Sequence, residues 1–150
     1  MALVCSLVVA ASLTVSASSP PAAATSASLK STVDTLMFAT SLERFIAIAN
    51  SPTHDARLDW SSDACSAPVV ESQGRSFNFT AACRRHDFGY RNLSRIDRGK
   101  WWTSATRQLV DSQFRRDMRH DCDRRVRTFR LRCLAWVEVF YRAVRTYAGP

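Results

Sequence analysis

The chain has 150 residues and a formal net charge of +8, and all of its 21 basic residues except Lys30 and Lys100 are arginine. After the first 11 residues, no apolar run approaches the roughly 20 residues that a membrane-spanning helix needs, which excludes a later transmembrane segment. The charge excludes neither nucleic acid nor an anionic lipid surface as a partner, because arginine binds the phosphates of both. For the arginines that gather between residues 115 and 132, a solvated helix face is the alternative.

The N-terminal segment has the composition of a secretory signal. Residues 1–11 are apolar and are followed by small residues, which predicts a signal peptide over residues 1–18 and a secreted, extracellular protein. An apolar helix that stays in the fold is the alternative, because no Lys or Arg precedes the apolar run. Residues 19–30 are rich in Ala, Ser and Pro without periodicity, and we expect a flexible or processed extension there, with no packed structure up to about Ser28. The main domain is then residues 31–150.

Helical signals begin at the start of this domain. Residues 31–34 have the form of a capping box, and apolar residues at helical spacing follow, which predicts a first helix from Ser31 to Asn50. Ser51 and Pro52 suit the first positions of a short second helix that reaches Trp60. The Ser, Pro and Gly content of residues 61–79 predicts a loop.

The second half of the chain keeps the helical period. A third helix is expected from Thr80 to about Ile96, and Gly99 breaks the pattern. Ser104 can cap a fourth helix, and residues 126–147 predict a fifth. No segment of useful length alternates like a strand. The sequence therefore predicts an all-α, compact domain of about five helices in which two central helices lie antiparallel.

The cysteines predict disulfide bonds. Cys5 falls in the predicted signal peptide, and the remaining four form an even set in an exported protein. Four cysteines permit three pairings, and the sequence alone does not choose among them. A zinc site is disfavoured because no CxxC pair is present. The four are Cys65, Cys83, Cys122 and Cys133.

The most informative segment is residues 83–92, with the sequence CRRHDFGYRN. His86 can take a proton from water near neutral pH, and the Asp87 carboxylate is a natural ligand for a hard cation such as calcium. On a helix, neighbouring side chains point about 100° apart, so a cation and an attacking water can lie side by side. The pair indicates hydrolysis beside a metal. The alternative for His86 is a core histidine held by a neighbour.

This segment resembles the HDFGYRN segment of the small secreted phospholipases A2 of bacteria and fungi. Residues 58–65 resemble the calcium loop of that family, and residues 110–114 resemble the segment that carries the aspartate partner of its histidine. Residues 135–144 are similar to its closing helix. The resemblance extends over about residues 58–149 and implies a disulfide-stapled helical fold with two central catalytic helices.

The resemblance also implies a role for each site residue. His86 would be the general base that deprotonates a water, and Asp111 would orient it; the alternative for Asp111 is an ordinary acid on a helix surface. Asp63, Asp87 and the main-chain carbonyl of Ala64 would bind Ca²⁺, with other oxygens completing the shell. The alternative for Asp63 is a turn residue bonded to its own backbone.

The disulfide pairing is likewise implied by the resemblance. Cys65 would pair with Cys83 and fasten the calcium loop to the catalytic helix. Cys122 would pair with Cys133 and fasten the ends of two later helices.

The resemblance implies no role for five further aromatic or imidazole side chains. Trp101 and Trp102, next to Lys100, would either enter a lipid interface or plug the space between helices. Tyr90 would either support the histidine and aspartate by hydrogen bonding or simply pack. His54 and His120 stand in no motif and are expected at the surface.

These observations predict a secreted, calcium-dependent phospholipase A2 that cleaves the sn-2 ester of glycerophospholipids. Its expected partner is a phospholipid membrane or micelle surface, with no nucleic acid, and the protein is expected to be a monomer. One alternative is a cationic, membrane-active binding protein without catalysis. Another is a secreted ribonuclease, which usually needs a separate acid and base, and no second histidine stands in a suitable context.

Overall fold

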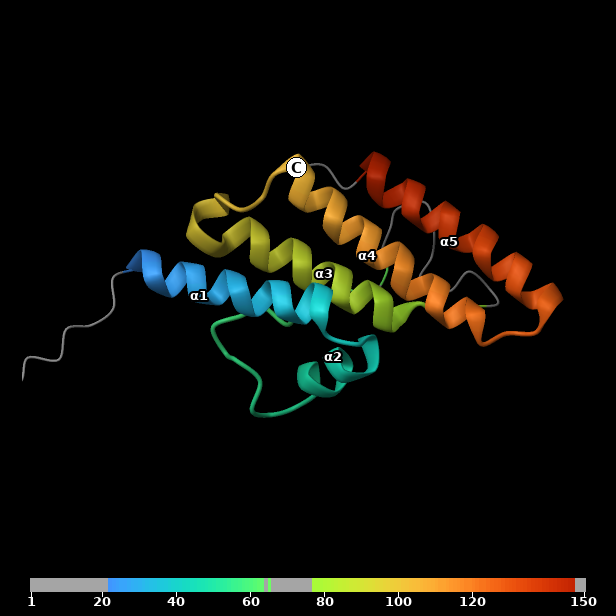
Figure 1. The fold of residues 1–150 in the computed structure, drawn as a ribbon, viewed down its shortest axis with the longest axis horizontal. Coiled ribbons are helices and arrows are strands. Elements are labelled where there is room, and N and C mark those ends of the chain that lie inside the picture. The colour runs from blue at the N-terminus through green and yellow to red at the C-terminus, as the bar shows by residue number, and fades with distance from the viewer. Residues whose placement is uncertain (1–21, 64, 66–76, 148–150) are drawn as a thin grey trace, which may run out of the picture.

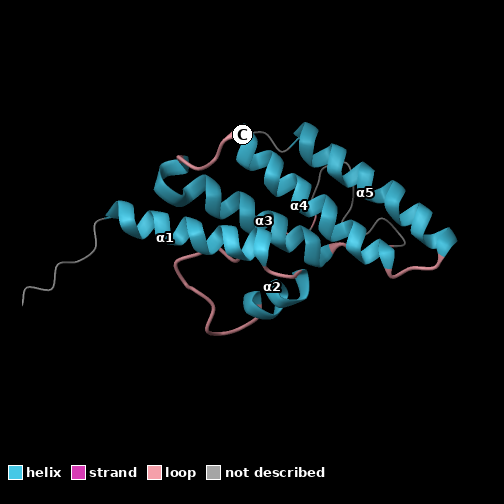
Figure 2. Cartoon of the chain, in the orientation of Figure 1, coloured by secondary structure: helices cyan, strands magenta, loops and turns pink. Residues whose placement is uncertain are grey.

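The computed structural model describes residues 22–63, 65 and 77–147. The predicted signal peptide and Ala64 lie outside these residues. The described part is built from helices joined by loops, without a strand, and this confirms the all-α prediction (Figure 2). None of its helices is both long enough and apolar enough to cross a bilayer.

The first helix begins earlier than the sequence predicts. Helix α1 spans Ala22–Asp34 and continues into a π-helical turn, η1, over Thr35–Ala39. Residues 22–34 contain no Gly or Pro and are rich in alanine, so they favour a helix, and Val33 packs fully buried in the core. The prediction of no structure up to about Ser28 is therefore wrong for residues 22–28, which are helical. Residues 19–21 lie outside the described residues, and the processing of residues 19–30 stays a prediction.

The predicted helix from Ser31 to Asn50 is in fact interrupted. The backbone is extended at Thr40, and α2 then spans Leu42–Ala49. The Ser41 side chain caps α2 by accepting a hydrogen bond from the backbone N–H of Arg44 at 3.2 Å. This cap stabilises the interruption, because the N–H of Arg44, in the first turn of α2, has no partner within the helix.

Residues 51–60 form turns, so the prediction of a short second helix is wrong. The Ser51 hydroxyl accepts from the Thr53 backbone N–H at 3.2 Å, and the Trp60 indole donates to the Asp55 carbonyl at 2.9 Å. Side-chain bonds of this kind offer the backbone an alternative to a helix. The sequence predicts His54 at the surface. It is half-buried instead, because its ring packs against Trp60 with ring centroids 5.0 Å apart.

The remaining helices agree with the sequence pattern. Helix α3 spans Thr80–Arg95 and is followed by a 3₁₀ turn, η2, over Ile96–Gly99. Gly99 has φ +79°, which favours glycine, and an added Cβ would lie 3.0 Å from the carbonyl oxygen of Ser94. Helix α4 spans Ser104–Asp123 and α5 spans Arg127–Tyr147.

The cap of α4 differs from the prediction by one residue. Thr103, not Ser104, is the N-cap, and its hydroxyl accepts from the Thr106 backbone N–H at 3.1 Å. Either hydroxyl residue suits this position chemically, and the extended backbone falls at Thr103.

Helices α3 and α4 are the centre of the structure and lie antiparallel, as predicted (Figure 1). Helix α5 packs along α4, and α1 packs along α3. The two disulfides have the pairing that the resemblance implies, with Cα–Cα distances of 5.3 Å for Cys65–Cys83 and 5.6 Å for Cys122–Cys133. The first joins the loop before α3 to that helix, and the second joins the end of α4 to α5.

A buried ion pair fixes α3 against α4. Arg85 and Asp117 are 2% and 5% exposed, and Arg85 donates to both carboxylate oxygens of Asp117, with 2.8 Å between Nε and Oδ2. Arg85 also donates to the carbonyl of Thr40 at 2.5 Å. One guanidinium therefore joins both central helices to the break between η1 and α2.

We expect Arg85→Met to lower the free energy of unfolding by about 3–5 kcal/mol, because it leaves the buried carboxylate of Asp117 without its partner. The double variant Arg85→Met/Asp117→Leu should recover most of this loss, because apolar residues of similar volume often replace a buried pair without cost. Urea unfolding of the three proteins measures both effects. A double variant as unstable as the single one would contradict this explanation.

Candidate active site

His86 lies on the side of α3 that faces α4. The residue is 7% exposed, and its ring packs between Tyr90 and Phe114, with centroid distances of 4.4 and 4.7 Å. Its Nε2 atom is 2.9 Å from Oδ1 of Asp111, which lies on α4 and is fully buried. The antiparallel packing of the two helices therefore brings together the two residues that the sequence singles out.

Asp111 is the centre of a hydrogen-bond network. Its Oδ1 accepts from Nε2 of His86 and, at 2.7 Å, from the hydroxyl of Tyr90. Its Oδ2 accepts from Arg145 of α5 at 2.8 Å, and Nε of Arg107 lies 3.8 Å from the same oxygen. Tyr90 therefore supports the histidine–aspartate pair by hydrogen bonding, which is one of the two roles that the sequence allows.

This network decides the charge of the carboxyl group. Burial raises the pKa of Asp111, but the hydrogen bonds from His86, Arg145 and Tyr90 outweigh burial and hold the pKa below its ordinary value. Burial, together with the bond to Asp111, raises the pKa of Tyr90, so the phenol keeps its proton and donates. The site therefore pairs a buried carboxylate with a histidine.

Arg107 and Arg145 belong to the site although sequence reasoning did not single them out. Nη2 of Arg107 donates to the carbonyls of Val144 and Arg145 at 3.0 and 2.9 Å, in the last turn of α5, where helical carbonyls lack internal partners. Arg107 thus holds the end of α5 in the place from which Arg145 reaches Asp111. Arg107 is only four residues from Asp111, but its bonds to the end of α5 and the bond of Arg145 to Asp111 join residues more than 30 positions apart, which no local pattern predicts.

On the next residue of α3, the Asp87 carboxylate binds the preceding loop. Its Oδ2 accepts from the Ser62 hydroxyl at 2.6 Å and from the Asp63 backbone N–H at 3.2 Å. Burial is the main cause that raises the pKa of Asp87. The hydrogen bond from Ser62 lowers this pKa, and the negative charge of Asp63 raises it further. The Asp63 side chain is 61% exposed, and Arg91 Nη2 lies 3.9 Å from its Oδ2.

Asp63 and Asp87 carry the kind of oxygen ligand that a hard cation prefers. The negative charge of Asp63 helps to raise the pKa of Asp87, and a cation bound near both would oppose that effect. Within the described residues no group of three His, Cys, Asp or Glu side chains could hold a metal. Calcium takes about 6 to 8 oxygen ligands, and carbonyl groups and water can supply those that the two carboxylates do not. The expected carbonyl ligand, Ala64, lies outside the described residues.

The remaining sequence expectations concern residues near the site. Trp102 packs edge-on against Tyr90 with centroids 4.6 Å apart, and Trp101 lies half-buried beneath the ammonium groups of Lys30 and Lys100. These contacts favour the plug reading for the tryptophan pair. His120 is exposed, as predicted.

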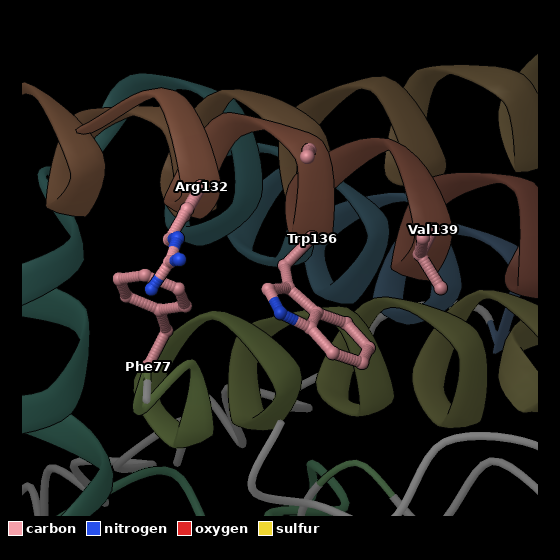
Figure 3. Close-up of a pocket in the computed structure, with 5 residues that line it drawn as sticks. Phe77, Arg132, Trp136 and Val139 are labelled. Atoms are coloured by element: carbon pink, nitrogen blue, oxygen red, sulfur yellow. The ribbon is translucent and has the colours of Figure 1, made fainter. Parts of the chain in front are cut away.

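A hollow of about 330 Å³ lies away from these residues, on α5 (Figure 3). It is lined by Phe77, Arg132, Ala135, Trp136 and Val139. None of the candidate site residues contributes to its wall. It therefore plays no part in the arrangement around His86.

The fold and the site define a class of protein: a small, disulfide-linked helical domain with a histidine–carboxylate pair buried between two antiparallel helices. The family model for prokaryotic phospholipase A2 matches residues 33–148. The chain belongs to the prokaryotic phospholipase A2 family.

Two fungal proteins are similar to the chain, and each is named secretory phospholipase A2. The protein from Arthroderma benhamiae is 32% identical over 115 residues, which cover 75% of this chain and 74% of the relative. The protein from Beauveria bassiana is 35% identical over 116 residues, which cover 77% of this chain and 57% of the relative.

We expect Arg145→Gln to make the protein unfold at a higher pH on acidification. The folded-state pKa of Asp111 lies below its ordinary value, so its contribution to stability is present above about pH 4 and is lost as the pH falls through the folded pKa. Removing a bond that lowers this pKa should start the loss sooner. Acid unfolding followed by circular dichroism measures the midpoint, with the exposed Arg132→Gln on the same helix as control. Equal midpoints for the two variants would show that Arg145 does not stabilise the Asp111 carboxylate.

Proposed function

We propose that this protein is a secreted, calcium-dependent phospholipase A2 that hydrolyses the sn-2 ester of glycerophospholipids. The observation that carries the proposal is the His86–Asp111 pair, buried between two antiparallel helices and adjacent to Asp87 in a chain of this family. The names of the two fungal relatives support secretion. The expected surface of action is a phospholipid membrane or micelle.

His86 acts as the general base. A neutral imidazole that donates its Nε2 proton to Asp111 has its lone pair on Nδ1. Nδ1 takes a proton from a water molecule as the water oxygen attacks the carbonyl carbon of the sn-2 ester. The same proton then passes from Nδ1 to the glycerol oxygen as the carbon–oxygen bond breaks. The products are a lysophospholipid and a fatty acid.

Asp111 stabilises the imidazolium without taking its proton. This role needs an ionised carboxylate in a fixed orientation, and its partners meet both needs. Arg145 compensates the buried charge through Oδ2, while Tyr90 donates to Oδ1 and fixes the carboxylate plane beside the imidazole. The two bonds come from different helices, so the carboxylate is held from two directions.

Asp63 and Asp87 would hold calcium, together with the carbonyl of Ala64. When bound there, the ion supplies positive charge to the phosphate and to the ester carbonyl oxygen as negative charge develops on it. The chain contributes the placement of both carboxylates: Asp87 on α3, and Asp63 on a loop that Ser62 and the Cys65–Cys83 disulfide fasten to α3.

His86→Ala should lower the rate of fatty acid release from sn-2 labelled phosphatidylcholine vesicles by about 10²- to 10⁴-fold, because the general base is gone. His120→Ala, at an exposed histidine on α4, should keep the wild-type rate. Vesicle leakage is measured in the same samples. Leakage without fatty acid release, equal in wild type and in His86→Ala, would reject the enzyme and favour the cationic binding protein.

Chelation of calcium should abolish release, and calcium should raise the melting temperature of the wild-type protein. Asp63→Asn should weaken calcium binding by at least about tenfold, because it removes one carboxylate charge. The control is Asp123→Asn, at a similarly exposed side chain of α4 (54% against 61% for Asp63). If both variants bind calcium like the wild type in calorimetry, this site is wrong.

A further inference from the structure

A second hollow lies on the outward face of α4, and its lining is almost entirely cationic. It has a volume of about 290 Å³ and is lined by Ser112, Arg115, Arg116 and Arg119. These positions are three and four residues apart and share one helix face. Asp111, Phe114 and Met118 are buried on the opposite side of the helix, so the hollow is separate from the candidate active site.

The charge in this hollow is not balanced. Nε and Nη2 of Arg115 donate to one oxygen of Glu138 on α5 at 2.9 and 2.7 Å, and Arg119 lies 3.8 Å from the same oxygen. Arg116 instead donates to the neutral amide oxygen of Gln113 at 3.2 and 2.6 Å. Arg115 and Arg119 thus share one carboxylate, while Arg116, within the described part of the chain, bonds only to a neutral amide. The mutual repulsion of the three guanidinium groups along this helix face would be relieved by a bound anion.

Two of these arginines are held in place before any ligand binds. The Gln113 amide that accepts from Arg116 donates in turn to Asp117 at 2.7 Å, which connects Arg116 to the buried Arg85–Asp117 pair. Arg115 lies over the ring of Tyr141, with 5.0 Å to the centroid. A pre-organised side chain loses less entropy on binding, so these arginines are better suited to a ligand than mobile surface cations.

We infer that this hollow binds a phosphate group, presented by an anionic phospholipid. Arginine forks match phosphate oxygens in bidentate fashion, and the Ser112 hydroxyl adds a further hydrogen-bond partner. The choice of a lipid as the carrier of this phosphate rests on the proposed function, since a phospholipase meets such headgroups at the surface of its substrate. Free phosphate has the same chemistry and is distinguished by the test. The site anchors the enzyme at a headgroup that it does not cleave.

The test measures binding without hydrolysis. Vesicles of ether-linked phosphatidylcholine, with or without ether-linked phosphatidic acid, are sedimented with the wild-type protein in the presence of chelator. The variant is Arg116→Gln/Arg119→Gln. The control is Arg44→Gln/Arg127→Gln, which removes the same charge at two exposed arginines on α2 and α5. Calorimetry with inorganic phosphate forms a second arm, and vesicles made anionic with a fatty acid form a third.

We expect phosphatidic acid to retain the wild-type protein and the hollow variant to bind at least about tenfold more weakly than the control variant, since bonds to charged groups are lost. If inorganic phosphate binds and competes, the site also takes free phosphate; if it does not, the site takes lipid headgroups only.

Three results would overturn the inference: equal losses in both variants, equal retention by fatty acid vesicles, or preferential binding of an oligonucleotide at the same phosphate concentration. Hydrolysis of ester-linked phosphatidylcholine is followed in parallel. If the wild-type protein hydrolyses the lipid but shows no specific binding to phosphatidic acid, only this inference is wrong. If the wild-type protein does not hydrolyse the lipid, the proposed function is wrong.

Discussion

The buried carboxylate of Asp111 is the constraint on which the rest of the site depends. A fully buried charge is costly unless it is paired and hydrogen-bonded, and here the partners come from three helices: His86 and Tyr90 from α3, Arg107 from α4 itself and Arg145 from α5. The same bonds that make burial possible orient the imidazole. Fold stability and the geometry of the histidine are therefore properties of one network, and a change at α5 reaches the chemistry on α3.

The Arg85–Asp117 pair sets the register in which this network forms. It joins α3 to α4 less than two turns from His86 and Asp111, so a shift of one helix along the other would break both pairs. On α3, the neighbours Arg85 and His86 have different partners: Arg85 holds the two central helices together through a buried ion pair, and His86 bonds to the buried carboxylate of Asp111. Asp87, the third residue of the run, fastens the loop that carries Asp63. Three consecutive side chains thus connect the packing of α3 and α4, the histidine–aspartate pair and the loop that carries Asp63.

The arginines of this basic chain divide into groups with different physical roles. One group bonds to buried or half-buried partners within the fold, and its charge is compensated there: Arg85, Arg107 and Arg145. Arg115, Arg116 and Arg119 face outward, and among the described residues only the first and the last contact a carboxylate, that of Glu138. Net charge alone does not separate these groups, because it counts both equally. Their separation explains how one chain can use arginine for stability and still keep a cationic surface on the outward face of α4.

The sequence by itself determined the helical class, the third to fifth helices, and the residues of the histidine–aspartate pair, because hydrophobic period and a local motif are written in neighbouring residues. It misjudged residues 22–60. The start of α1 follows from an alanine-rich segment without Gly or Pro, whereas the break at Thr40 and the turns after Ser51 involve side-chain hydrogen bonds that compete with helix propensity. Only the tertiary structure decided that Arg107 and Arg145 complete the site and that Asp111 is buried. Apart from the contact between Arg107 and Asp111 within one helix, those facts rest on contacts between residues far apart in the chain, which no local pattern of residues encodes.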